Sequence, residues 1–314
     1  MRISSSLLQS RSLTGMQKQQ TTMEEAYTKV ITNQRITNPS DDAYGSARLV
    51  GLDNEMSKNG QYSSTRTEMN NQLKLQETAL GSATDALQDV RTRVVQALNG
   101  TLTDENRSAL AKDLRGGYET LASVANTRDG SGNYLFSGYK SDQAPFNIDE
   151  STMTITQTAS GQDYQGGDRM SYRVDASRTV SGVVTADSAF KTSDGENLFN
   201  VIKDMVNALE TPTEDGTTSV SSIQETLSAG LKKLDSGMDN ISIVRAEGGT
   251  RMNEISALDT QWADNKVNLQ GSIDKLGVTD MAEAISNYSL SQVGYEAAIR
   301  SYAMLNGTSL MDLL

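Results

Sequence analysis

Asp41 and Asp42, adjacent in the stretch RITNPSDDAYGSARL (residues 35–49), are the residues of this sequence best suited to catalysis or metal binding. Two acids could act as acid and base or hold a divalent cation. Asp41 and Asp42 are direct neighbours, however, and only helical residues three or four apart share a face. The alternative is helix initiation, with Asn38 as N-cap, Pro39 at the first helical position and both acids in the first turn. We favour the capping interpretation.

The rest of the sequence offers little for catalysis. His and Cys are absent, which excludes thiolate nucleophiles, Cys-based zinc sites and the commonest general base near neutral pH. The stretch DGSGN, Asp129 to Asn133, is similar to the start of a calcium-binding loop, but Tyr134 stands where glycine is needed. We therefore expect a turn there and predict no cofactor and no metal.

Charge and hydropathy limit the partners. The chain has 28 basic and 40 acidic residues, a formal net charge of −12, which opposes binding to phosphate backbones. We therefore predict no nucleic acid partner. No stretch approaches the roughly 18 apolar residues of a membrane span, so membrane insertion is not expected, and the N-terminus has no apolar run suited to a cleaved signal peptide.

The elements that position these residues are predominantly helical. Spacings of three and four, typical of a helix packing along its length, occur near the N-terminus. They recur with a coiled-coil register in a second region, where Gln76 is the one strongly polar member. The first set is Leu13, Met16, Gln20, Met23, Tyr27 and Val30; the second is Met69, Leu73, Gln76, Leu80, Ala83, Leu87, Val90, Val94 and Ala97.

Further helices follow the same rule. Asn99 and Gly100 end the second pattern, and Thr103 can cap a new helix that reaches about Val124 or Ala125. Two C-terminal sets repeat the spacing and predict helices at the end of the chain. They are Leu227, Leu231, Leu234, Met238 and Ile241, and then Met281, Ile285, Tyr288, Gln292, Tyr295, Ile299 and Tyr302.

The middle of the chain is built differently. It contains all four Phe residues, and the stretches YLFSGY, TMTITQ, MSYRVD and TVSGVV predict short antiparallel strands. The predicted fold is mainly α with a β-rich insertion: a long antiparallel helical bundle or coiled-coil rod formed by both chain ends, plus a small β domain.

Several stretches resemble one family. TNQRITNPSDDAYGSARL and SNYSLSQVGYEAAIRSYAMLNGTSLMDLL are similar to the terminal regions of bacterial flagellins. LASVANTRDGSGNYLFSGYKSDQAPF, residues 121–146, resembles the hook–filament junction branch of that family, the third hook-associated proteins, more than filament flagellin. The resemblance covers nearly the whole chain and is weakest over residues 150–220.

The resemblance implies a structural protein outside the cell, in the bacterial flagellum, exported by the type III apparatus without a cleaved signal. The implied partners are other copies in a homo-oligomeric ring, the first hook-associated protein, flagellin and a cytoplasmic export chaperone. It also implies terminal inner segments at 1–40 and 280–314, a helical rod at 41–130 and 195–279, and a β-rich outer domain at 131–194.

The predicted interface residues come from two sources: the resemblance, and the apolar positions spaced three and four apart, here called seams, at both chain ends. The corner residues Asn38, Pro39, Asp41 and Asp42 match a family motif that shapes the connection between helical layers and lies at a subunit contact. We expect the same contact role for Leu13, Met16, Met23, Tyr27, Ile285, Tyr288, Tyr295, Ile299 and Tyr302.

Two alternatives remain at this stage. One is a minor flagellin, a filament subunit, within the same structural class. The other is a cell-surface hydrolase that uses carboxylates roughly 5–10 Å apart, as glycosidases do. The strand region offers no spaced acid motif, so we expect no enzymatic activity.

Overall fold

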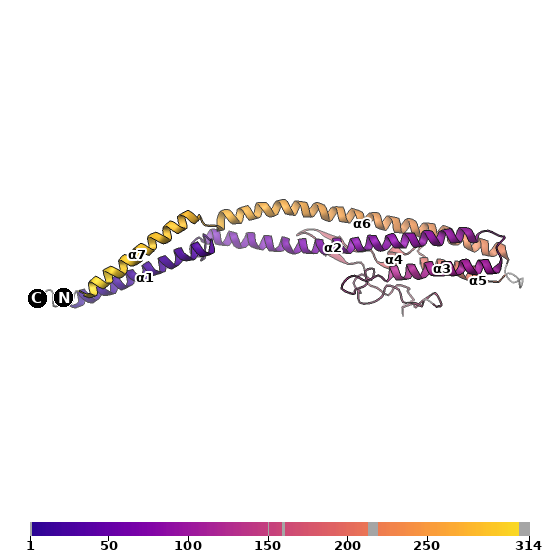
Figure 1. The fold of residues 1–314 in the computed structure, drawn as a ribbon, viewed down its shortest axis with the longest axis horizontal. Coiled ribbons are helices and arrows are strands. Elements are labelled where there is room, and N and C mark those ends of the chain that lie inside the picture. The colour runs from indigo at the N-terminus through magenta and orange to yellow at the C-terminus, as the bar shows by residue number, and fades with distance from the viewer. Residues whose placement is uncertain (1, 150, 159–160, 213–218, 308–314) are drawn as a thin grey trace. The chain divides into compact units, whose positions relative to one another are not determined.

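The chain is mainly helical in the computed structural model, which describes residues 2–149, 151–158, 161–212 and 219–307 (Figure 1). The fold class predicted from the sequence, mainly α with a small β-containing insertion, is confirmed. The elements are α1 (Arg2–Thr32), α2 (Ala43–Ala97), α3 (Asp104–Ala125), β1 (Ile148–Asp149), β2 (Thr154–Ile155), β3 (Ser171–Arg173), β4 (Thr179–Ser181), α4 (Ala186–Ala189), α5 (Leu198–Glu210), α6 (Val220–Gly277) and α7 (Met281–Gly307).

The contacts divide the chain into two compact units. Unit 1 contains Met1–Lys58 and Trp262–Leu314, and unit 2 contains Asn59–Gln261. The three-part division inferred from the resemblance stays a prediction. In the described part of the chain, no helix is both long and apolar enough to cross a lipid bilayer.

Unit 2 has a continuous hydrophobic core to which α2, α3, α5 and α6 contribute. All nine positions of the seam predicted over residues 69–97 are buried, which confirms the heptad-like register. Gln76, only 1% exposed, accepts a hydrogen bond on Oε1 from the backbone N–H of Val184 at 2.9 Å. Its polarity within the seam is therefore satisfied by the insertion.

Helices α2 and α6 run antiparallel within unit 2. Three ion pairs that join them show this direction, since the residue numbers on α2 rise from pair to pair while those on α6 fall. The pairs are Arg66–Asp259 at 2.5 Å, Glu77–Arg245 at 2.6 Å and Arg91–Asp235 at 2.7 Å.

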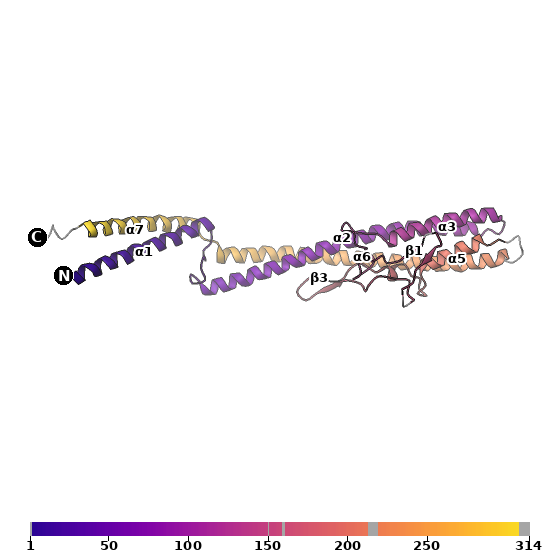
Figure 2. The same cartoon turned by 90° about the horizontal axis from the view of Figure 1, so that it is seen from below.

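Helix α3 starts and ends where the sequence predicts. The hydroxyl of Thr103 accepts a hydrogen bond from the N–H of Asn106 at 3.3 Å, and Asp104 and Glu105 occupy the first turn. Figures 1 and 2 both place α3 beside α5. The Tyr118 ring of α3 meets the Phe199 ring of α5 edge-on, with centroids 5.4 Å apart.

The insertion contains two antiparallel two-stranded sheets, β1–β2 and β3–β4. Strands β2, β3 and β4 lie within three of the four predicted stretches, and β1 lies outside all of them. The fourth prediction, a strand at YLFSGY, is wrong. Leu135 and Phe136 are buried, but the chain around them is irregular, and Gly138 has a φ of +59°. Its apolar residues pack into the core of unit 2 from a loop, which a strand-like composition does not distinguish. The turn predicted at DGSGN is confirmed, since Oδ1 of Asp129 accepts from the Asn133 N–H at 2.9 Å.

The β3–β4 hairpin is held on α2 and α6 by a second, smaller core. Val174 and Val180 of the hairpin segment pack there with Met69, Leu73 and Ile255.

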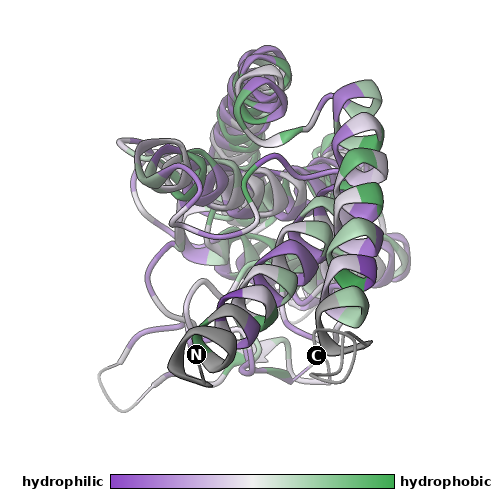
Figure 3. Ribbon diagram, turned by 90° about the vertical axis from the view of Figure 1, so that its left-hand side faces the viewer, coloured by the Kyte–Doolittle hydropathy of each residue, from purple (hydrophilic) through white to green (hydrophobic). Residues whose placement is uncertain are grey.

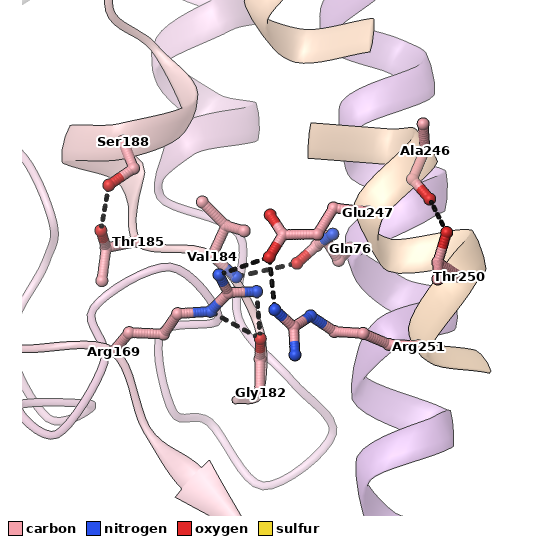
Figure 4. A network of polar contacts seen from close by, with 10 residues as sticks. All are labelled: Gln76, Arg169, Gly182, Val184, Thr185, Ser188, Ala246, Glu247, Thr250 and Arg251. Atoms are coloured by element: carbon pink, nitrogen blue, oxygen red, sulfur yellow. Dashed lines mark hydrogen bonds and ion pairs between the residues drawn. The ribbon is translucent and has the colours of Figure 1, made fainter. Parts of the chain in front are cut away.

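Polar contacts hold the insertion on the helices of unit 2 as well (Figure 4). Arg169 donates to the carbonyl of Gly182 through Nε and Nη2, at 2.9 and 2.7 Å, and Nη1 lies 3.1 Å from Glu247 on α6. Arg251 pairs with the same carboxylate. Burial by itself raises the pKa of Glu247, but the hydrogen bonds and charges of the two arginines leave it below its ordinary value.

Candidate functional site

The corner between α1 and α2 positions the two candidate acids. Oδ1 of Asp42 accepts from the N–H of Gly45 at 2.8 Å, so Asp42 is the residue that caps α2. The predicted cap at Asn38 with Pro39 in first helical position is wrong, because α2 begins at Ala43 and has no acid in its first turn. The structural interpretation of the corner holds with a different capping residue.

Asp41 folds back instead of entering the helix. Its Oδ2 accepts from the backbone N–H groups of Thr37 and Asn38, both at 3.2 Å, and from the Thr37 hydroxyl at 3.1 Å. These bonds hold residues 37–41 in a turn, which is why the helix starts later than predicted.

The two carboxylates serve different partners and do not share a ligand position. The backbone N–H of Asn38 is the main cause that lowers the pKa of Asp41. The N–H of Gly45, followed by the guanidinium of Arg35, lowers the pKa of Asp42. Among the described residues no cluster of three or more Asp or Glu side chains is arranged to hold a metal ion.

The lowered pKa values predict acid sensitivity of the corner. Stability from Asp41 and Asp42 is fully present above the ordinary Asp pKa of about 4 and is lost as the pH falls through the lower folded-state value. We expect hydrogen-exchange protection of the Gly45 amide to fall below about pH 4. The Asn106 amide is the internal control, because the Thr103 hydroxyl that holds it does not titrate in this range. Equal protection of both amides throughout the titration contradicts this account.

The corner is bonded to the connection between α6 and α7 through Arg35. Its backbone N–H donates to the carbonyl of Gly277 at 2.7 Å, and its Nε donates to the carbonyl of Leu276 at 2.8 Å. Its Nη2 reaches Oδ2 of Asp42 at 2.9 Å. Sequence reasoning missed Arg35, because the carbonyl partners lie about 240 residues away and the sequence has no signal that pairs them.

Helices α1 and α7 pack against each other in unit 1, and the ring centroids of Tyr27 and Tyr288 lie 5.6 Å apart. Only part of the predicted seams is covered. Met16, Met23, Tyr288, Tyr295 and Tyr302 are half-buried, while Leu13, Tyr27, Ile285 and Ile299 are exposed.

Unit 1 leaves most of its large apolar side chains at its surface. Ala284 is its one fully buried apolar residue in the described part of the chain, whereas unit 2 buries apolar side chains throughout. Green and purple segments alternate along α1 and α7 in Figure 3, so apolar residues are spread along both helices. Leu290, Val293 and Met304, which are 72%, 64% and 71% exposed, lie outside the predicted seam and were missed.

Comparisons with known proteins assign the family. Residues 3–141 match the bacterial flagellin N-terminal helical region. The chain is 31% identical to the Flagellar hook-associated protein 3 of Escherichia coli strain K12 over 329 residues, covering 100% of this chain and 99% of the relative. Its identity to the protein of the same name from Salmonella typhimurium strain LT2 is also 31%, over 326 residues with the same coverage.

The chain belongs to the flagellar hook-associated protein 3 family. The resemblance to the hook–filament junction branch of the flagellins is thereby confirmed. A protein assigned as a flagellar hook-associated protein from Vibrio parahaemolyticus has 28% identity and a TM-score of 0.65, covering 76% of this chain and all of that one. The flagellar junction protein FlgL from Legionella pneumophila, at 18% identity, has a TM-score of 0.56 over 74% of this chain and all of that one. At that identity the second likeness supports the fold alone.

Proposed function

We propose that this protein is a structural adaptor at the junction between the flagellar hook-associated protein and the flagellin filament, and that it acts through helix packing without catalysis. The observation that carries the proposal is the surface of unit 1, where apolar side chains line α1 and α7 without a core of their own. A soluble monomer rarely exposes so much apolar surface unless a partner covers it. The full-length relatives from Escherichia coli and Salmonella typhimurium are flagellar hook-associated proteins, which supports the same role.

The proposed assembly is a homo-oligomeric ring outside the cell. Its neighbours are the first hook-associated protein and flagellin, and a cytoplasmic chaperone covers the terminal helices before export. In this arrangement residues 1–40 and 280–314 form the inner layer, residues 41–130 and 195–279 the helical rod, and residues 131–194 the outer domain. The contact residues are the corner Asn38, Pro39, Asp41 and Asp42, together with the apolar positions of α1 and α7 predicted from the sequence.

A filament subunit is the second candidate, because residues 3–141 match the flagellin N-terminal region. The two functions differ in what happens when the chain is absent. An adaptor is needed once, at the base of each filament, whereas a minor filament subunit is one component among many.

Deletion of the chain separates the two roles. For the adaptor we expect intact hooks without filaments and flagellin released into the medium, with filaments restored when the chain is supplied again. Electron microscopy of hook tips and measurement of flagellin in the culture supernatant provide the readout. Filaments that remain attached to hooks in the deletion strain contradict the adaptor role and favour the filament subunit.

A further inference from the structure

Two chain connections of unit 1 meet at one place. Residues 33–42 connect α1 to α2, and residues 278–280 connect α6 to α7. Gln34 and Val278 form an antiparallel bridge, and the Thr279 N–H donates to the carbonyl of Asn33 at 3.3 Å. The end of α1 is thus bonded to the start of α7, far away in sequence.

Arg35 joins the other two helix ends at this place. The last carbonyls of a helix have no partner within the helix and carry partial negative charge. Arg35 supplies donors for two of them, at Leu276 and Gly277 of α6. The same guanidinium holds the carboxylate of Asp42, which caps the start of α2. One side chain therefore contacts both the end of α6 and the cap of α2.

The corner also fits closely against the backbone of α2. A Cβ added at Gly45 would lie 2.5 Å from Oδ2 of Asp42 and 2.8 Å from Cδ1 of Ile36. A side chain at Gly45 would push the carboxylate away from its contact with Arg35. Gly45 thus provides a second, independent way to disturb the same contact.

We infer that Arg35 is a positioning residue that fixes the direction in which the α1–α7 pair leaves the adjoining parts of α2 and α6 within unit 1. Its planar guanidinium presents several donors in a fixed geometry, so it can cap α6 and hold Asp42 at the same time. Lysine carries the charge on a single flexible ammonium and cannot reproduce this double contact. The consequence for assembly rests on the proposed function, because a ring needs every subunit to present α1 and α7 in the same direction.

Spin labels within unit 1 test this positioning role of Arg35 in the isolated full-length chain. The native chain has no Cys, so Asn268→Cys on α6 and Ala297→Cys on α7, both at exposed positions, provide the two labelling sites. Pulsed electron paramagnetic resonance then measures the distribution of distances between them. With Arg35 present we expect one narrow distribution. With Arg35→Ala we expect a distribution about twofold broader, as for a hinge that has lost its fixing contacts.

Three further variants make the test specific. Arg35→Lys is expected to give intermediate broadening, and Gly45→Ala to broaden the distribution although Arg35 is intact. Arg48→Ala, which removes an exposed arginine from the first turns of α2 close to Gly45, is the matched control and should leave the width unchanged. Circular dichroism verifies equal helix content in all variants. An unchanged distribution in both Arg35→Ala and Gly45→Ala overturns the inference.

The link to assembly is measured separately. In a strain that lacks the native chain, Arg35→Ala should reduce the fraction of hooks with filaments, and Arg48→Ala should not. A broadened distance distribution together with normal filament attachment would support the positioning role of Arg35 and reject its role in assembly. Normal attachment in the deletion strain itself would instead reject the proposed function.

Discussion

Replacing Ile299 and Tyr302 with aspartate is expected to abolish junction formation while unit 2 stays folded. Both residues belong to α7, where Ile299 is 41% exposed and Tyr302 is half-buried, so the monomer tolerates the change at its surface. At the proposed subunit interface, however, each new carboxylate would be buried without a partner. About 3 kcal/mol for one such charge corresponds to roughly 100-fold weaker association.

The control for this double change is Ile243→Asp, because Ile243 is a 67% exposed apolar residue on α6 within unit 2. It introduces one carboxylate, half the charge of the double change, at a site for which we propose no contact. Electron microscopy of hook tips and pull-down with the export chaperone test the two binding events. Normal junctions and normal chaperone binding in the Ile299→Asp, Tyr302→Asp chain contradict the interface assignment.

Replacing Phe199 with alanine is expected to have the largest effect on the stability of unit 2. Phe199 is fully buried, and its ring centroid lies 5.4 Å from that of Tyr118, 5.2 Å from that of Phe146 and 6.0 Å from that of Phe190. Removing a buried aromatic ring leaves a cavity at the centre of this cluster. We expect the free energy of unfolding to fall by about 3–5 kcal/mol.

Urea unfolding followed by circular dichroism measures this loss. Tyr139→Ala is the comparison, since Tyr139 is also an aromatic residue of unit 2 but is 62% exposed. Its cost should be less than about 1 kcal/mol, as is usual for surface substitutions. Equal losses for the two variants would exclude a central role for the Phe199 ring.

Helical packing was predictable because its signal is local and periodic. Spacings of three and four over residues 69–97 identify one face of α2, and that face is buried at every predicted position. The helix cap at Thr103 has an equally local signal. Strands were harder to predict in the insertion, because Leu135 and Phe136 reach the core from an irregular loop and their composition suits a strand equally well.

The corner shows where local signals end. Asn38 and Asp42 are both good capping residues, and the choice between them depends on Asp41 turning back to Thr37 and on Arg35 holding Asp42. The second contact is part of a set that includes carbonyls of α6, which no local pattern reveals. The surface apolar residues of α7 outside the predicted seam were missed for a related reason, since periodicity identifies a buried face and these side chains are largely exposed.

Helix α2 is buried by segments that come much later in the sequence, and this affects the timing of folding. The partner of Gln76 lies 108 residues further along the chain, and those of Glu77 and Arg66 lie 168 and 193 residues further. Contacts of such long range close slowly and only after the later segment exists. At roughly 5–20 residues per second, synthesis leaves the α2 seam without its partners on α6 for on the order of ten seconds. During that interval the apolar face of α2 lacks the partners on α6 that cover it in the folded chain.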